Sequence, residues 1–413
     1  NGITPKRFEN GYNFMAVCKK GSYSKLIQFF KAGGVDIFNE KHKKMFVAFP
    51  PAEQFLIQTG KRLFKGMDDY NDVHRFQFDL ETEGLKASVD PIFQIGIKDN
   101  KGFELVLETK GDTPQKRRDS ERINIIKFFE LIDEIRPDLI SGYNSENFDW
   151  PYFKRRCERL GIDIEVIAKT LNPDKKIYWR DSMLKLGGES QAYQQTSMWG
   201  YNILDISHSV RRAQAINSNI KSWSLKYITQ YSGVAKPNRV YVPGDKLHTI
   251  WSDTNPYWFN DTDGSWGVIG ERGLPKGSVE VKGDYIVQRY LIDDLWETEQ
   301  IDVIYNQAAY LIAKLLPTSY TRSSTMGTAG QWKLIMAAWS YENKLAIPEL
   351  EKKRNFTGGL ARLLEVGYAK NVIKLDFAAL YPKTQLTHGI FPSLDISGVM
   401  EGLLTYVVDT RDK

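Results

Sequence analysis

The sequence predicts a mixed α/β protein with several domains (α+β multidomain), and three observations support this class. The 413 residues exceed the size at which a single hydrophobic core keeps growing, so two or three domains are expected. Between residues 75 and 84, apolar and polar side chains alternate with a period of two, which is typical of a β-strand. Apolar residues recur at helical spacing between residues 125 and 135 and between residues 285 and 316.

The strand at residues 75–84 carries two acids on one face. Asp79 and Glu81 lie two positions apart, so their side chains point the same way, roughly 7 Å apart along the strand. Two carboxylates so placed repel each other unless a cation lies between them. A pair of divalent metals would serve, and two-metal sites cleave and form phosphodiesters. Taken alone, the pair is more typical of an exposed strand face with two solvated acids.

Composition restricts the metal and the cellular location. Two cysteines without a CxxC pair, and five histidines, argue against zinc, so oxygen-bound Mg²⁺ or Mn²⁺ is expected. The same cysteine usage favours a reduced, intracellular protein. There is no apolar run of about 18 residues and no signal-peptide pattern, so no membrane partner is expected. The chain begins at Asn1 rather than Met, which favours its being part of a longer protein.

Basic residues form short clusters although the net charge is only +5. The clusters are residues 116–118, 154–156, 211–212 and 352–354. Beside many tyrosines and tryptophans, such clusters fit a nucleic-acid surface. Each cluster alone is more often a solvated face.

The first half of the chain places a third acid at a strand–helix junction. Strands are expected at residues 92–97 and 103–107, which with the acidic strand would form an antiparallel meander. A helix ending before Pro137 and a short buried strand at residues 139–140 follow. Asp149 then lies near the first turn of a helix, where a plain N-cap is the alternative role. Residues 164–205 read as irregular.

The second half adds a fourth acid on a helix. Tyr290 and Asp294 are spaced i, i+4 and share a helix face, with Asp293 one step round. Such a pair is either a surface hydrogen bond or a metal ligand beside a phenol that positions a water. Residues 317–330 are expected to be a linker, and residues 372–375 a strand that ends in Asp376. The acidic run at residues 261–264 reads as a loop.

These acids fall within motifs that resemble those of family B DNA polymerases. The three exonuclease-like motifs are Phe78-Asp79-Leu80-Glu81, Asn144-x-x-x-Phe148-Asp149 and Tyr290-x-x-x-Asp294. Asp376-Phe-Ala-Ala-Leu-Tyr-Pro382 resembles the first polymerase motif, usually written DFxSLYP. Order and separations agree with the family, and the resemblance runs from about residue 70 to residue 413.

The resemblance implies a ribonuclease H-like 3′→5′ exonuclease domain with a small N-terminal domain and an incomplete polymerase palm. The implied boundaries are an N-terminal domain at 1–75, the exonuclease at 76–316, a linker and helical return segment at 317–356, and the start of the palm at 357–413. No organic-cofactor site is implied.

The resemblance also assigns roles to the residues. The implied metal ligands, for two Mg²⁺ or Mn²⁺ per active site, are Asp79, Glu81, Asp149 and Asp294 in the exonuclease and Asp376 in the polymerase. Tyr290 would orient the attacking water, and Asn144 and Phe148 would position the terminal nucleotide. The ring of Tyr381 would pack under the sugar and select deoxynucleotides.

Departures from the family limit the polymerase part. Ala379 and Lys383 replace two common serines, and no KxxxNSxYG-like or YxDTD-like motif follows Asp376. The 413 residues alone are therefore not expected to extend a primer. The missing polymerase part, in cis or as a second subunit, is an expected partner.

The predicted function is that of a family B DNA-directed DNA polymerase with proofreading exonuclease activity. A viral source is expected, so the protein would lie in the cytoplasm of a bacterial cell or of a virus-infected host. Its other expected partners are the DNA primer-template, the 3′ end of single-stranded DNA, deoxynucleoside triphosphates and a processivity factor. Two alternatives stay open: a stand-alone DEDDy-type 3′→5′ exonuclease, and a catalytically silent DNA-binding scaffold. The segment from Asp376 argues against the first, and the presence of all four exonuclease acids argues against the second.

Overall fold

The chain contains two compact units in the computed structural model. The structure describes residues 3–7, 14–18, 20–42, 49–171, 176–186, 189–271, 273–345, 358–360, 362–393, 395 and 397–412. One unit is Pro50–Ala338, and the other combines Asn1–Phe49 with Trp339–Lys413. The division into four segments expected from the sequence stays a prediction.

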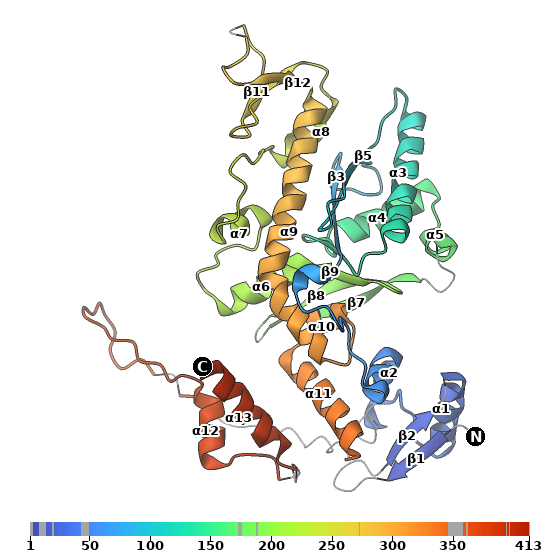
Figure 1. The fold of residues 1–413 in the computed structure, drawn as a ribbon, viewed down its shortest axis with the longest axis vertical. Coiled ribbons are helices and arrows are strands. Elements are labelled where there is room, and N and C mark those ends of the chain that lie inside the picture. Colours follow the sequence, from blue (N-terminus) through green and yellow to red (C-terminus); the bar gives the residue numbers. More distant parts are fainter. Residues whose placement is uncertain are drawn as a thin grey trace. The chain divides into compact units, whose positions relative to one another are not determined.

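A mixed sheet forms the centre of the first unit (Figure 1). It has five strands in the order β5-β4-β3-β6-β9. Its strands are β3 (Arg75–Thr82), β4 (Ile92–Asp99), β5 (Glu104–Glu108), β6 (Leu139–Gly142) and β9 (Asn202–Asp205). The first three pair antiparallel, which confirms the expected meander. Strands β6 and β9 run parallel to β3, so their carboxyl ends meet at one edge of the sheet.

Helices α3 (Pro114–Ile135) and α4 (Asp149–Leu160) cover one face of this sheet. The alternation in β3 explains why, because its apolar residues are buried and point toward these helices. The ring of Phe78 lies 4.9 Å from that of Trp150, and Phe128 stacks on Phe153 at 4.8 Å between centroids. The polar residues of β3 are left on the opposite face.

Helix α9 (Gly283–Leu315) runs along that opposite face, in contact with β3 and β4 (Figure 1). Its 33 residues confirm the long helix expected from the periodicity. Around it lie α6 (Ile206–Ile216), α7 (Leu225–Tyr231), α8 (Leu247–Ser252), α10 (Tyr320–Thr325), α11 (Thr328–Asn343) and the short strands β10 (Tyr257–Phe259), β11 (Trp266–Val268) and β12 (Val279–Val281). The acidic run at 261–264 lies in the turn between β10 and β11, which confirms a loop.

The stretch 164–205 is regular, and the expectation that it is irregular was wrong. It contains α5 (Ile164–Leu171) and a hairpin of β7 (Ile177–Leu186) and β8 (Glu189–Met198) that pairs over ten residues. Few positions of either hairpin strand are both apolar and buried. The ladder is therefore held by its backbone hydrogen bonds rather than by an apolar face, and a hydrophobic period of two is missing from the sequence.

The remaining elements are smaller. Helix α2 (Pro51–Thr59) belongs to the first unit. The second unit contains the antiparallel pair β1 (Ile3–Arg7) and β2 (Phe14–Cys18), helix α1 (Tyr23–Ala32), and α12 (Leu380–His388) in contact with α13 (Val399–Asp412). Among the described residues, no helix combines the length and apolar composition needed to cross a membrane.

Candidate metal centre

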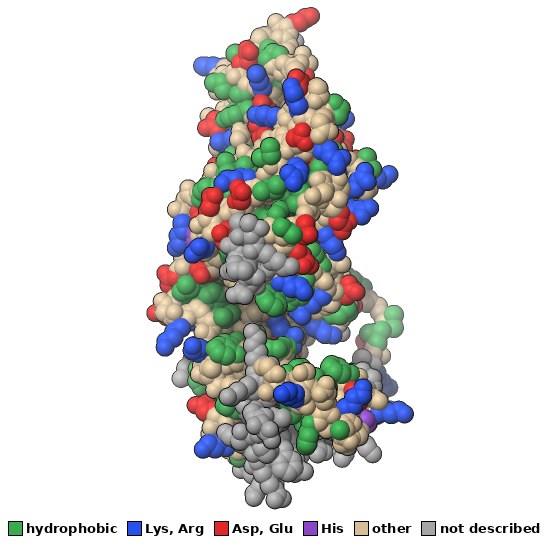
Figure 2. All heavy atoms as spheres, turned by 90° about the vertical axis from the view of Figure 1, so that its right-hand side faces the viewer, with side chains coloured by type: hydrophobic (Ala, Val, Ile, Leu, Met, Phe, Trp, Pro, Cys, Tyr) green, Lys and Arg blue, Asp and Glu red, His purple; other side chains and the backbone are tan. Residues whose placement is uncertain are grey.

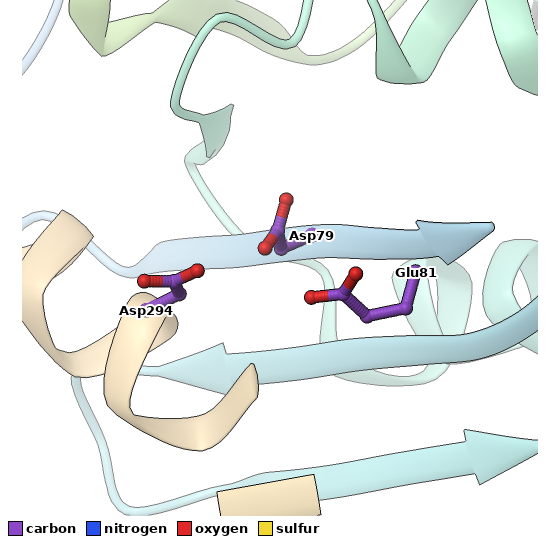
Figure 3. A group of neighbouring side chains, drawn as sticks. All are labelled: Asp79, Glu81 and Asp294. Atoms are coloured by element: carbon purple, nitrogen blue, oxygen red, sulfur yellow. The ribbon is translucent and has the colours of Figure 1, made fainter. Parts of the chain in front are cut away.

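Three carboxylates from distant parts of the sequence converge on the face of the sheet that α9 covers. Asp79 and Glu81 come from β3 and Asp294 from α9, and one carboxylate oxygen of each lies within 4.8 Å of the others. Figure 3 shows the three carboxylates turned toward one another. The shared strand face of Asp79 and Glu81 was predicted from the alternation in β3, and Asp294 was expected to join them as a metal ligand. The structure brings the three carboxylates together, and their role as metal ligands stays a prediction.

A glycine in the neighbouring strand lets α9 approach this closely. Gly96 of β4 is the register partner of Asp79. A Cβ atom at this position would lie only 2.7 Å from Cγ of Leu291 and 2.9 Å from Cδ1 of Leu295 on α9. Any larger residue would therefore push the helix away from the sheet. Since Asp294 is on the same helix turns, this close packing brings its carboxylate to the acids of β3.

The three acids hold protons more tightly than ordinary carboxylates. Burial, followed by the charge of Asp294, raises the pKa of Asp79 to about 7. Burial also raises the pKa of Glu81, and the charges of Asp79 and Asp294 raise it further. Burial raises the pKa of Asp294, although nearby cations oppose this shift. Packing like charges into one buried site is unfavourable unless a cation neutralises them.

Asp149 lies beside this cluster but is not one of the three converging groups. It is the first residue of α4, it is 2% exposed, and its Oδ1 has no hydrogen-bond partner in the described part of the chain. Burial raises its pKa, and the charge of Asp79 raises it further. Phe148 holds the N-cap position, so the alternative role of Asp149 as the N-cap is off by one residue.

These groups fit a hard divalent cation. All four offer carboxylate oxygens, which Mg²⁺ and Mn²⁺ prefer. The raised pKa values of Asp79 and Glu81 and the unpartnered Oδ1 of Asp149 are what such a site shows without its cation. The number of metal ions stays a prediction.

The hydroxyl of Tyr290 is hydrogen-bonded to a lysine that was not predicted from the sequence. The Tyr290 hydroxyl accepts a hydrogen bond from Nζ of Lys226 at 2.6 Å, and Nζ also lies 4.5 Å from the ring centroid. The Tyr290 hydroxyl in turn lowers the pKa of Asp294 by hydrogen bonding. Burial, and then the charge of Asp294, raises the pKa of Tyr290, so the phenol stays protonated and can donate.

The two neighbouring aspartates of α9 have different partners. Asp293 is fully buried and accepts from Nζ of Lys236 at 2.5 Å and from the N–H of Val240 at 2.8 Å. Asp294 instead faces β3 and pairs with the guanidinium of Arg239. Asp294, the aspartate that shares a helix face with Tyr290, is therefore the one in the cluster, and its role as a metal ligand stays a prediction. Arg239 was not anticipated, because its chain segment approaches α9 only in the fold.

The two residues expected to position a nucleotide lie on the loop between β6 and α4. Asn144 has a left-handed backbone with φ of 61°, which is uncommon for a residue other than glycine. Its Oδ1 accepts from Nδ2 of Asn147 at 3.0 Å. The ring of Phe148 is partly buried and lies 5.3 Å from that of Tyr152. The loop continues directly into Asp149, so all three motif residues occupy one short stretch.

The polymerase-like motif builds no comparable site within the described residues. Residues 372–377 form no strand, so the expected strand ending in Asp376 was wrong. The side chains of this stretch are exposed, and a lone strand lacks the ladder partners that would hold it. Tyr381 is on α12 with 80% of its surface exposed. The roles of Asp376 and Tyr381 stay predictions.

The basic clusters are partly structural. Arg156 forms a buried pair with Glu121 at 2.5 Å, and Arg212 donates to the carbonyl oxygen of Met326 at 2.9 Å. On the face drawn in Figure 2, Lys and Arg side chains are interspersed with Asp and Glu. Residues 352–354 lie outside the described residues. A nucleic-acid surface therefore stays a prediction.

The fold and the acid cluster define an α/β protein with a candidate divalent-metal site, and comparisons with known proteins show which family it resembles. Residues 65–228 match the model of the exonuclease domain of DNA polymerase family B. Over this region the chain is therefore similar to the exonuclease domain of family B DNA polymerases, and the resemblance seen in the motifs is confirmed.

The relatives are archaeal enzymes that are longer than this chain. The DNA polymerase of Thermococcus hydrothermalis is 24% identical over 397 residues, covering 88% of this chain and 21% of its own length. That of Pyrococcus glycovorans is 25% identical over 356 residues, covering 83% and 40%. The solved family B DNA polymerase of Pyrobaculum calidifontis has a similar fold, with a TM-score of 0.53 at 17% identity, over 85% of this chain and 43% of that one. The chain thus spans less than half the length of these relatives.

Proposed function

We propose that this chain is part of a family B DNA polymerase and performs metal-dependent 3′→5′ exonucleolytic proofreading. The observation that carries the proposal is the convergence of Asp79, Glu81 and Asp294 within 4.8 Å, from two segments more than 200 residues apart. A solvated strand face would not need a buried third acid from a helix. The match of residues 65–228 to the exonuclease domain supports the same activity.

In this proposal Asp79, Glu81, Asp149 and Asp294 hold two Mg²⁺ or Mn²⁺ ions. The ions would supply Lewis acidity and a nucleophilic water at neutral pH. The protonated Tyr290 hydroxyl accepts from Lys226 and donates toward Asp294. Its remaining lone pair would accept a hydrogen bond from the water that attacks the terminal phosphodiester and so orient that water.

The loop before α4 binds the end of the strand. Asn144 offers an amide for hydrogen bonds to the terminal nucleotide, and Phe148 offers an aromatic face for its base or sugar. The cleaved product is a deoxynucleoside monophosphate. Single-stranded DNA with a free 3′ end is the proposed substrate.

Template-directed DNA synthesis is proposed for the complete protein. Asp376 would bind metal and Tyr381 would select deoxynucleoside triphosphates, once further palm strands, in cis or on a second subunit, pair with residues 372–377. DNA primer-template and a processivity factor are the partners this activity needs. A viral source stays a prediction, since the relatives named above come from archaea.

A nuclease assay on labelled single-stranded DNA tests the proposal. With Mg²⁺, a 5′-labelled oligonucleotide should shorten stepwise and a 3′-labelled one should release labelled mononucleotide at once. EDTA should stop both reactions. Asp79→Ala combined with Glu81→Ala should lower the rate by more than about 10³-fold, the upper range for loss of one electrostatic group.

The matched control is Glu104→Ala, which removes an exposed carboxylate from strand β5 of the same sheet. It should leave the rate unchanged. Degradation from the 5′ end, or full activity in the double variant, contradicts the proposal.

A further inference from the structure

A buried aspartate that belongs to none of the motifs holds the loop that carries Asn144. Asp205 is the last residue of β9, and its register partner is Gly142, the last residue of β6. The parallel strands therefore end side by side, and the loop of residues 143–148 begins next to the Asp205 side chain. Asp205 is 4% exposed, so its charge needs hydrogen-bond donors from the protein.

Both carboxylate oxygens of Asp205 are used to hold this loop. Oδ1 accepts the N–H of Asn144 at 2.9 Å, and Oδ2 accepts the N–H of Glu146 at 3.1 Å. Hydrogen bonds to an ionised acceptor are about twice as strong as neutral ones. Because the two hydrogen bonds come from Asn144 and Glu146, they fix the direction of the loop as well as its position.

The same carboxylate is itself rigidly placed. Its Oδ1 also accepts the N–H of Ser207 at 3.0 Å and the hydroxyl of Ser207 at 2.6 Å, which caps helix α6. Capping the helix accounts for one oxygen only. The second oxygen and the bond to Asn144 serve the loop, so the residue does more than begin a helix.

The loop needs this support because its conformation is costly. The left-handed backbone of Asn144 is of a kind that persists only where surrounding contacts determine it. The N–H of Phe148 donates to the carbonyl oxygen of Asn144 at 3.1 Å, so the position of Phe148 depends on that of Asn144. A second anchor is Glu146, whose Oε1 accepts the N–H of Thr196 at 3.0 Å.

We infer that Asp205 is a positioning residue that sets Asn144 and Phe148 for binding the 3′-terminal nucleotide, an inference that rests on the proposed exonuclease function. It acts through the loop and does not touch the reacting atoms. Asp205→Asn replaces one acceptor oxygen by an NH₂ group, which faces backbone N–H donors and cannot bond them. The exonuclease rate should fall about 10- to 100-fold, as for other groups that orient a site residue.

Two control variants separate positioning from general stability. Ser207→Ala removes the hydroxyl bond of Ser207 to the same carboxylate but leaves its N–H bond and both loop bonds, so the rate should stay within about twofold of wild type. Asp163→Ala removes an aspartate that accepts the N–H groups of Glu165 at 3.0 Å and Val166 at 3.1 Å, away from the loop. It should likewise leave the rate unchanged.

A double-mutant cycle with Asn144 distinguishes a positioning role of Asp205 from a purely structural one. If Asp205 acts through Asn144, then Asp205→Asn should add little to the loss already caused by Asn144→Ala. Its effect should also shrink on DNA whose 3′-terminal residue lacks a base. Additive losses, equal on both substrates, overturn the inference.

Hydrogen exchange of the wild-type chain tests the geometry without any activity. The peptide amides of residues 143–148 should exchange as slowly as those of β6, and fast exchange there overturns the inference even if Asp205→Asn does not fold. An active wild type with an unimpaired Asp205→Asn variant overturns the inference alone. A wild type without nuclease activity overturns the proposed function and this role of Asp205 with it.

Discussion

Asp79 and Asp376 are both aspartates of short acidic motifs, but they lie in opposite surroundings. Asp79 is on β3, which pairs with β4 on one side and with β6 on the other, and α9 packs over it. Asp376 lies in an exposed stretch, 372–377, that forms no strand. The pKa of Asp79 is raised by burial and by Asp294, because the fold forces like charges together.

The difference shows what turns an acidic motif into a candidate metal centre. A carboxylate becomes useful only when its backbone is fixed and a second segment brings further oxygens to it. Strand β3 has both sheet neighbours, and Gly96 admits the helix that carries Asp294. Among the described residues, the stretch around Asp376 has neither a neighbouring strand nor a helix that brings further carboxylates to it. The following predictions test this contrast, beginning with the largest expected effect.

Asp294→Ala should lower exonuclease activity by more than about 10³-fold, because it removes an oxygen donor from the cluster. Asp293→Ala should retain far more activity but lower the free energy of unfolding by about 1–3 kcal/mol, because the N–H of Val240 loses its acceptor. Nuclease rates and denaturant unfolding of both variants provide the check. If Asp293→Ala is instead the variant without activity, the metal ligand on α9 is misassigned.

Tyr290→Phe should have an intermediate effect, with a fall in rate of no more than about 10²-fold, the lower range for loss of a positioned proton donor. The ring stays in the core beside Lys226, and only the hydroxyl is lost. Single-turnover rates with excess enzyme would measure the chemical step. A loss as large as that of Asp294→Ala would show that the phenol does more than orient a water.

The acid cluster should make the metal-free protein less stable as pH rises. The raised pKa of Asp79, about 7, lies above its ordinary value near 4, so the folded chain holds a proton that the unfolded chain releases. The cluster's contribution to the free energy of unfolding is therefore present at about pH 4 and falls as pH rises toward 7.

Thermal unfolding between pH 4 and pH 8 would measure this slope. Asp79→Asn should flatten it, because the group no longer titrates. Mg²⁺ should raise the melting temperature more at pH 8 than at pH 5, since it binds the ionised acids. A cluster whose stability contribution rises with pH in the absence of metal would contradict the assigned pKa shifts.

Asp376→Asn should have the smallest effect. Its side chain is exposed, so the free energy of unfolding should change by less than about 0.5 kcal/mol and the exonuclease rate should not change. Denaturant unfolding and the nuclease assay give both values. A marked loss of either would mean that the two acidic regions depend on each other.

The sequence predicted those features that depend on one local pattern. The alternation in β3 put Asp79 and Glu81 on one face, and the i, i+4 spacing put Tyr290 and Asp294 on one side of a helix. The meander and the long helix followed from the same periodicities. Each of these needs only neighbouring residues to decide it.

Other features depended on contacts that no local pattern contains. Lys226 and Arg239 reach the cluster only because their segment folds against α9. The hairpin of β7 and β8 is held by its backbone ladder, so hydrophobic spacing could not indicate it. The prediction of a strand before Asp376 was wrong for the opposite reason. The apolar pattern is present in the sequence, but no partner strand pairs with it among the described residues.

The most direct test of the central claim is to measure Mn²⁺ binding at pH 8 by calorimetry or electron paramagnetic resonance. The wild-type chain and the Asp79→Asn variant are compared. The account predicts two Mn²⁺ ions per wild-type exonuclease site, with affinity that falls as pH drops toward 5, and loss of at least one ion in the variant. The unpaired Asp376 should bind none. Equal binding by the wild type and by Asp79→Asn would contradict a metal centre built on β3 and α9.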